Sequence, residues 1–189
     1  MANSKRRCKH CREYFPSEDG VKVPAGWFCS FGHATEFARS KAKRDTERKH
    51  RKEYKEAKEK LKTLSDHLRE SQQVFNAYIR ERDKDQPCIS CGNHHGGQYH
   101  AGHYLSVGAR PNLRFDEMNV HKQCQPCNTH LSGNLINYRI KLIEKIGIAE
   151  VDRLESDQEP KRYRIDDAKR IKAEYKQKLK ELRDEQNQR

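Results

Sequence analysis

Residues 88–130 carry the stretch that decides the fold, CISCGNHHGGQYHAGHYLSVGARPNLRFDEMNVHKQCQPCNTH. Cys88 and Cys91 form one Cys-x-x-Cys pair, Cys124 and Cys127 form another, and 32 residues separate the two pairs. In a reducing cytosol such pairs indicate metal ligands rather than disulfides. Because four thiolates make a closed tetrahedral site, the sequence predicts a structural Zn²⁺ held by these four cysteines.

A second cluster lies near the N-terminus, where Cys8 and Cys11 are followed by Cys29 and His33. Three thiolates and one imidazole also suit tetrahedral zinc. This short segment cannot fold on its apolar residues alone, and zinc binding of roughly 10–16 kcal/mol would supply the missing stability. We therefore expect a second structural Zn²⁺ here.

Histidines and asparagines lie between and beside the central cysteines. Phosphodiester cleavage needs a base that activates water and a cation that offsets charge on the phosphate and the leaving oxygen. His103 would be the general base, since its unperturbed pKa lies near neutrality, and Asn119 would hold its ring through a hydrogen bond. His100 and Asn128 would ligate one catalytic divalent ion, with His130 as a further ligand candidate. The ion would be Mg²⁺ or Mn²⁺, and a nitrogen ligand favours Mn²⁺ somewhat.

Each of these residues also has a structural explanation. A histidine in a zinc-ribbon hairpin often only covers the core, and Asn128 suits a helix cap. The joint pattern favours catalysis: a histidine-containing strand, a central asparagine, and an asparagine directly after the second cysteine pair. This layout resembles that of the HNH (ββα-metal) nucleases, whose treble-clef-like core clamps a hairpin and a helix with zinc knuckles.

The rest of the chain is strongly polar. Charged residues make up 36% and hydrophobic residues 33% of its 189 residues, whereas ordinary globular domains are about a quarter charged and about half apolar. This excludes one large core, and we expect a mainly α fold of small zinc-stabilised α+β modules and long solvated helices. The 40 Lys and Arg against 28 Asp and Glu give a net charge of +12. Such a balance favours a polyanionic partner, most often nucleic acid.

Four segments separate by composition. They are an N-terminal zinc finger, a long basic helix without Gly or Pro, an HNH-like nuclease core and a C-terminal helical region, at residues 1–37, 38–83, 84–134 and 135–189. In the last segment we predict a helix over 135–146 that stops at Gly147, and a short helix over 149–154. A final helix, capped by Asp166 or Asp167, has an apolar face formed by Ala168, Ile171, Tyr175, Leu179 and Leu182.

The predicted helix at 38–83 carries a heptad stripe with one polar interruption at Ser71. Its members are Tyr54, Ala57, Leu61, Leu64, Leu68, Phe75 and Tyr78. So narrow a stripe must pack either on the C-terminal helix or on its copy in a homodimer, through residues 54–78. The first half of the helix, residues 38–62, holds 12 Lys and Arg against five Asp and Glu. This basic excess has two equally weighted explanations: the helix contacts phosphates, or it simply has a charged face in solvent.

Over nearly its whole length the chain resembles the NinG, or Rap, recombination proteins of lambdoid phages. The matching stretches keep the order of the family's motifs and lie at residues 8–11, 76–83, 87–92, 101–104, 113–115, 121–124, 127–128, 132–135 and 171–180. The resemblance implies a structure-specific, metal-dependent endonuclease that cuts branched DNA, notably Holliday junctions and D-loops, in phage recombination. At His100 the chain departs from the aspartate expected in the family, which removes a negative charge from the metal site.

The location and the oligomeric state follow from similar reasoning. No run of 18 or more apolar residues exists, and the basic N-terminus leads into Cys8 rather than an apolar stretch, so neither a membrane span nor a secretory signal is expected. We expect a cytoplasmic protein of the bacterial host cell with no membrane partner. The zinc-clamped hairpin also resembles another class of phage junction-resolving enzymes, which are dimers because resolution takes two symmetric nicks.

A non-catalytic, zinc-containing nucleic-acid-binding protein is the alternative interpretation. It would share the composition, the charge and the cysteines. His103 and Asn119 together distinguish the two interpretations, because a pure binding ribbon has no reason to need both.

Overall fold

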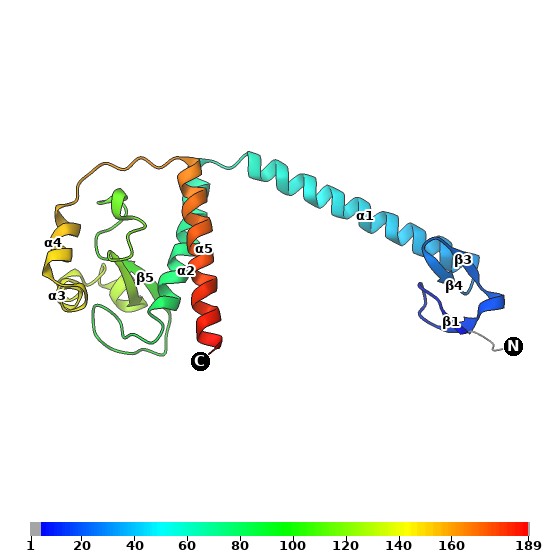
Figure 1. The fold of residues 1–189 in the computed structure, drawn as a ribbon. Helices are drawn as coiled ribbons and strands as arrows, with labels where there is room; N and C mark the ends of the chain where they lie inside the picture. The colour runs from blue at the N-terminus through cyan, green and yellow to red at the C-terminus, as the bar shows by residue number, and fades with distance from the viewer. Residues whose placement is uncertain (1–4, 189) are drawn as a thin grey trace. The chain divides into compact units, whose positions relative to one another are not determined.

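The computed structural model describes residues 5–188 and is mainly helical with small β-hairpins (Figure 1). Residues 1–4, with which the predicted basic N-terminus and zinc finger begin, lie outside the described residues, as does residue 189. The chain forms two compact units, the first ending at Leu61 and the second beginning at Lys62. No helix within the described range combines the length and the apolar character needed to traverse a lipid bilayer.

The first unit consists of two small antiparallel hairpins and one long helix. Strand β1 pairs with β2 and β3 pairs with β4; their bounds are Lys5–Arg7, Tyr14–Pro16, Val21–Val23 and Gly26–Phe28, with a 3-10 turn at Ser17–Asp19. Phe15 and Phe28 pack with Cys8 and Ala34 in a core of only a few side chains. A core this small supports the expectation that this unit depends on a metal for its stability.

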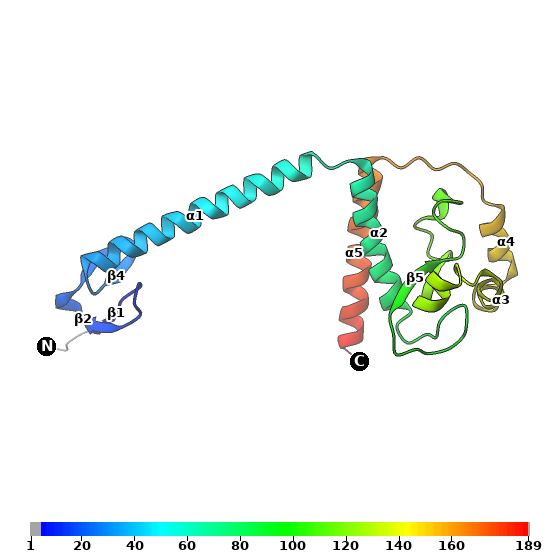
Figure 2. The same cartoon turned by 180° about the vertical axis from the view of Figure 1, so that it is seen from behind.

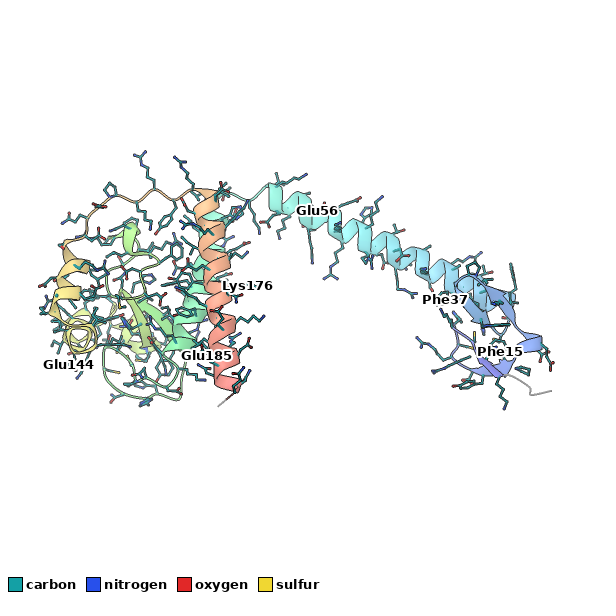
Figure 3. All side chains as sticks on the ribbon, viewed as in Figure 1. Phe15, Phe37, Glu56, Glu144, Lys176 and Glu185 are labelled. Carbon is teal, nitrogen blue, oxygen red and sulfur yellow. The ribbon has the colours of Figure 1, made fainter. Side chains whose placement is uncertain are left out.

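Helix α1, Phe31–Lys60, follows the second hairpin and is solvated along most of its length. Ser30 caps its first turn, because the Ser30 side chain accepts a hydrogen bond from the backbone N–H of His33. Ala34 is the buried residue of this helix, and side chains project from it on several sides, as Glu56 does in Figure 3.

The prediction of one continuous helix over 38–83 is wrong. Helix α1 ends at Lys60, and a separate helix α2, Leu64–Arg82, follows after a short break. Thr63 starts the new helix: its Oγ1 accepts from the N–H of Asp66, and the Asp66 carboxylate accepts from the N–H of Thr63. Such a reciprocal capping box is a strong helix start, and it lies in a segment whose composition alone suits uninterrupted helix.

In the second unit, α2 lies side by side with the C-terminal helix α5, Ile165–Asn187, as both views show (Figures 1 and 2). Phe75 and Ile79 pack with Tyr175 and with Val120 of the neighbouring hairpin. The predicted apolar face of the last helix is confirmed, since Ala168 and Tyr175 are buried and Ile171, Leu179 and Leu182 are half-buried. Asp167 accepts from the N–H of Arg164, one turn earlier.

The buried face of α2 differs from the predicted heptad stripe. Ser71, expected as an interruption, is fully buried, and its hydroxyl donates to the carbonyls of His67 and Ala168 at 2.8 and 2.7 Å. A small hydroxyl here lets the two helices approach closely while its own polar atom is satisfied. Tyr54 and Leu61 of the stripe belong to the first unit and are exposed. The homodimer stays a prediction.

A central hairpin and two short helices complete the second unit. Strand β5 pairs antiparallel with β6, and a π-helical turn follows; the bounds are Tyr99–His103, Val120–Cys124 and Pro126–His130, with a 3-10 turn at Pro111–Leu113. Helices α3, Leu135–Ile146, and α4, Ile148–Ser156, meet at Gly147, whose φ of +84° favours glycine. The predicted helix over 135–146 and its stop are confirmed. Tyr138, Leu142, Val151 and Leu154 form the centre of a second core.

Substituting Thr63 tests the break between α1 and α2. We expect Thr63→Ala to lower the free energy of unfolding of the second unit by about 1 kcal/mol, because the α2 cap loses its acceptor. Urea denaturation followed by circular dichroism measures this loss. Thr46→Ala is the matched control: the Thr46 hydroxyl bonds only to Ala42 O inside exposed α1, so its midpoint should not fall. Equal midpoints for the two variants would contradict the capping role.

Candidate functional site

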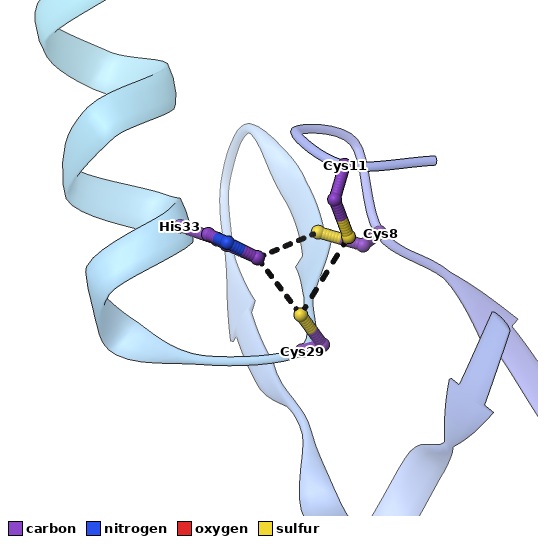
Figure 4. Close-up of side chains that lie close together, drawn as sticks. All are labelled: Cys8, Cys11, Cys29 and His33. Atoms are coloured by element: carbon purple, nitrogen blue, oxygen red, sulfur yellow. Dashed lines mark hydrogen bonds between the residues drawn. The ribbon is translucent and has the colours of Figure 1, made fainter. Parts of the chain in front are cut away.

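The N-terminal cluster brings its four predicted ligands together (Figure 4). The donor atoms of Cys8, Cys11, Cys29 and His33 all lie within 4.8 Å of one another. Cys11 Sγ lies 3.8 Å from Cys29 Sγ, and Cys8 Sγ lies 3.8 Å from His33 Nδ1. Tetrahedral zinc with Zn–S bonds of about 2.3 Å places its sulfur ligands about 3.8 Å apart. The cluster therefore fits a structural Zn²⁺.

Backbone amides favour the thiolate form of Cys8. Burial alone would raise the pKa of the Cys8 thiol, but N–H groups of Cys29, Cys11 and His10 donate to it and lower the pKa to about 6. A thiolate is the form of cysteine that binds metal. The amides of the knuckle thus prepare Cys8 as a zinc ligand.

The central cluster also brings its four predicted ligands together. The sulfurs of Cys88, Cys91, Cys124 and Cys127 lie within 4.8 Å of one another, and Cys91 Sγ is 3.9 Å from Cys124 Sγ. Burial raises the pKa of Cys88, yet backbone N–H groups, including the Cys124 amide at 3.3 Å, outweigh it and lower the pKa. This second cluster also fits structural zinc.

His103, at the end of β5, has one side-chain hydrogen bond that decides its chemistry. Its Nε2 lies 3.1 Å from the backbone carbonyl oxygen of Arg114. A carbonyl only accepts, so Nε2 carries the ring proton and Nδ1 is left with a free lone pair. Burial lowers the pKa of His103, and the Arg114 carbonyl opposes this only in part. The imidazole is therefore neutral near pH 7 and able to accept a proton at Nδ1.

The predicted hydrogen bond from Asn119 to His103 is wrong. Asn119 is fully buried, and its Nδ2 donates to the carbonyls of Leu105 and Leu113 at 3.0 and 3.2 Å. Its Oδ1 accepts from the N–H of Leu105 at 2.9 Å. Asn119 thus ties the loop between the two strands to the hairpin. The group that bonds to the His103 ring is the Arg114 carbonyl.

His100 and Asn128, predicted as ligands of one divalent ion, lie within hydrogen-bond distance of each other. His100 Nδ1 on β5 lies 2.8 Å from Asn128 Nδ2 on the turn after β6. If the amide turned by half a rotation, Oδ1 and the imidazole would face the same point. His130 is exposed at the end of that turn, and no hydrogen bond joins it to either residue within 5–188.

The donor set at this point is sparse. No group of three or more His, Cys or carboxylate ligands in the described residues includes His100. One imidazole and one amide are a small ligand set for a divalent ion, and the lining of the cleft around them includes no carboxylate. A second structural interpretation is equally direct, because the two side chains satisfy each other as a neutral hydrogen-bonded pair.

His103, His100 and Asn128 line two clefts that have residues in common. His103 and Asn128 line one of about 440 Å³, and His100 and Asn128 line the other, of about 480 Å³. Ala101 and Asn128 belong to both clefts. Asn128 therefore belongs both to the cleft that contains His103 and to the cleft that contains His100, whereas the buried Asn119 lines neither.

Sequence reasoning missed Arg114 and Gln72. Arg114 supplies its carbonyl to His103, and its Nε donates to Gln72 Oε1 on α2 at 2.9 Å. A backbone carbonyl carries no residue-type signal, so the first contact could not be read from composition or spacing. The stretch 113–115 could have drawn attention only as part of the family resemblance.

Comparisons with known proteins give one consistent result. The family model described as "Bacteriophage Lambda NinG protein" matches residues 1–185. Protein ninG of Salmonella phage P22 is 46% identical over 205 aligned residues, covering 100% of this chain and 99% of the relative. Protein ninG of Escherichia phage lambda is 44% identical and that of Escherichia phage 933W 42% identical, each covering 98% of this chain and 97% of the relative. No solved structure matches the chain.

The zinc content tests both clusters. We expect two zinc ions per chain, and Cys11→Ser and Cys91→Ser should each lose one of them, because each removes a thiolate from a different cluster. Metal released on thiol modification and measured with a colorimetric chelator gives the count. His50→Ala is the control: His50 is an exposed histidine of α1 and belongs to none of the possible ligand groups among the described residues, so two ions should remain. A wild-type content of one or none would contradict the assignment.

Proposed function

Because the chain belongs to the bacteriophage lambda NinG family, we propose that it is a metal-dependent endonuclease that cuts branched DNA, namely Holliday junctions and D-loops, during phage recombination in the host cytoplasm. The observation that supports this proposal most directly is the environment of His103. Its proton is directed to the Arg114 carbonyl, and it lines a cleft with Asn128, whose side chain bonds to His100.

The supporting architecture is an HNH-like, ββα-metal core. The hairpin of β5 and β6 carries His103 and His100, and the turn after β6 carries Asn128. The four cysteines bind the ends of these segments, so a two-stranded hairpin that would be marginal alone becomes a rigid base for a site.

In the proposed reaction, His103 Nδ1 accepts a proton from water as the water attacks the phosphodiester phosphorus. The P–O bond to the leaving oxygen breaks, and that oxygen takes a proton from solvent. His100 and Asn128 would hold a divalent ion, Mg²⁺ or Mn²⁺, which when bound offsets negative charge on the phosphate and the leaving oxygen. Asn119 keeps the loop in place and so keeps the Arg114 carbonyl behind the His103 ring.

The charge distribution supports DNA as the substrate. Residues 38–62 hold 12 Lys and Arg against five Asp and Glu, and most of α1 is exposed. Phosphate contacts of this kind weaken steeply as salt rises, which gives the binding its own signature. The preference for branched DNA rests on the family alone, and two symmetric nicks would require a homodimer.

The alternative function is non-catalytic binding of nucleic acid. The neutral His100–Asn128 hydrogen bond favours it, since that pair is already satisfied and has no carboxylate beside it. Both functions predict salt-dependent binding, and only cleavage separates them.

Cleavage of a labelled four-way junction with Mg²⁺ or Mn²⁺ tests the proposal. We expect His103→Ala to bind the junction like the wild type in a gel shift and to cut it about 10²–10⁴-fold more slowly, because the general base is lost. His94→Ala, an exposed histidine in the Gly-rich turn, should cut normally. Wild type that binds but cuts with neither metal would leave the binding function in place of the nuclease.

The pH dependence of cleavage tests the state of His103. Burial lowers its pKa below the ordinary 6.5, so the neutral, active base persists as the pH falls through 6.5 and is lost only at lower pH. The acid limb of the single-turnover rate should therefore have its midpoint below 6.5. Rates measured from pH 5 to 8 with enzyme in excess decide this, and a midpoint above 6.5 would contradict the buried-base geometry.

A further inference from the structure

Helix α2 presents a polar stripe toward the proposed site. Gln72, Asn76 and Arg80 follow one another at intervals of four residues, a spacing that places side chains on the same side of a helix. Helix α2 packs against β5, and Asn76 and Arg80 line the same cleft as His100 and Asn128. Nothing in the proposed reaction so far uses these α2 side chains.

Arg80 differs from its neighbour Arg82. Arg82 donates to both carboxylate oxygens of Asp83 at 2.8 Å and to the Val120 carbonyl at 2.9 Å. Its guanidinium therefore has a structural role. Arg80 is exposed and makes no ion pair or hydrogen bond with any residue in the described part of the chain. One arginine at this end of α2 is therefore structural and the other is an unpaired guanidinium.

The cleft around Arg80 suits an anion. Its lining residues are Asn76, Arg80, Gln98, Tyr99, His100, Ala101 and Asn128, so it contains no carboxylate, and Arg80 is its one permanently charged group. A guanidinium presents paired N–H donors that match two phosphate oxygens. Such a cation beside a histidine and two amides is an arrangement that binds phosphate.

Asn76 is held in position for the same ligand. Its Oδ1 accepts from Gln72 Nε2 at 2.8 Å, which leaves the Asn76 amide nitrogen as a free donor at the cleft. Gln72 Oε1 in turn accepts from Arg114 Nε, and the Arg114 carbonyl accepts from His103 Nε2. Arg114 thus contacts both sides of the site, with its side chain bonded to Gln72 of α2 and its backbone carbonyl bonded to the ring of the proposed base.

We infer that Arg80, with Asn76, binds a backbone phosphate of the DNA strand to be cut, next to the His100–Asn128 pair. The inference rests on the proposed nuclease function and assigns its phosphate-binding side to α2. It makes α2 part of the site rather than only a support for the hairpin. A role of Arg80 confined to stabilising the helix end would alter unfolding and leave DNA affinity unchanged.

The test compares Arg80→Ala, Arg80→Lys and Arg69→Ala in the full-length protein. Arg69 is the matched control, an exposed arginine on α2 that pairs only with Asp66. Fluorescence anisotropy with a four-way junction, in chelator-free buffer without added Mg²⁺ or Mn²⁺ so that the structural zinc is kept, measures affinity across salt concentrations. Single-turnover cleavage with the divalent ion added measures the rate.

We expect Arg80→Ala to weaken binding about tenfold, which is about 1.4 kcal/mol, and to reduce the slope of log K against log salt by about 0.9, the value for one phosphate contact. Arg80→Lys keeps a cation and should restore the slope while recovering part of the affinity. Arg69→Ala should leave both unchanged. Thermal melts of the three variants identify any loss of folding. If Arg80→Ala is destabilised, the binding of Arg80→Lys is compared with that of the wild type instead.

The outcomes separate this inference from the nuclease proposal. If Arg80→Ala binds and cuts like the wild type while His103→Ala abolishes cutting, the nuclease stands and the Arg80 assignment is overturned. If the wild type never cuts but Arg80→Ala still loses affinity and salt slope, the phosphate site stands and the nuclease proposal fails. Equal losses in Arg80→Ala and Arg69→Ala would also overturn the assignment, because they would show only general charge attraction.

Discussion

The register of the β5–β6 hairpin is the constraint on which the second unit depends. The pairing of Tyr99 with Cys124 and of His103 with Val120 places His103 near the Arg114 carbonyl and His100 near Asn128. A slip by one residue would turn every side chain of a strand to the opposite face. Two strands alone hold a register weakly, and Cys124 fixes this one because it is at once the last residue of β6 and a member of the four-thiolate cluster. The cysteines therefore position His103 and His100 by fixing the register of the hairpin.

The outer edge of β6 is secured by the end of α2 rather than by a third strand. The N–H of Lys122 donates to the Asp83 carboxylate at 3.1 Å, Arg82 donates to the Val120 carbonyl, and the N–H of Ile89 donates to the Lys122 carbonyl. These contacts satisfy strand groups that would otherwise be open to pairing with another chain. They also set α2 in a fixed position beside the hairpin. The same contacts therefore fix the position of the polar stripe of α2 relative to the residues of β5.

The parts of the structure that sequence could predict are those set by local chemistry. Cysteine spacing identified both clusters because the ligands of each knuckle are neighbours in the chain, and Gly147 marked the end of α3 because its conformation favours glycine. The wrong predictions concern features that depend on contacts between distant parts of the chain or on backbone groups. Thr63 begins a helix inside a run of good helix formers, and Ser71 is buried because the Ala168 carbonyl, 97 residues away, accepts its hydroxyl. The partners of Asn119 and His103 are backbone carbonyls, which any residue type can supply, so the residues around the site were identified but their contacts were not.

Environment decides which histidine of the hairpin can act as a base. His121 lies on β6 with its Nδ1 3.3 Å from the hydroxyl of the fully buried Tyr138, and burial, reinforced by the charges of Lys145 and Arg82, lowers its pKa to about 3. That ring is buried, and its lowered pKa keeps it neutral near pH 7. His103 is also kept neutral by burial, but it lines an open cleft, and its hydrogen bond to the Arg114 carbonyl uses Nε2 and leaves Nδ1 available. The two histidines thus share a hairpin and a residue type, and the difference in access leaves His103 as the one whose lone pair can reach a substrate.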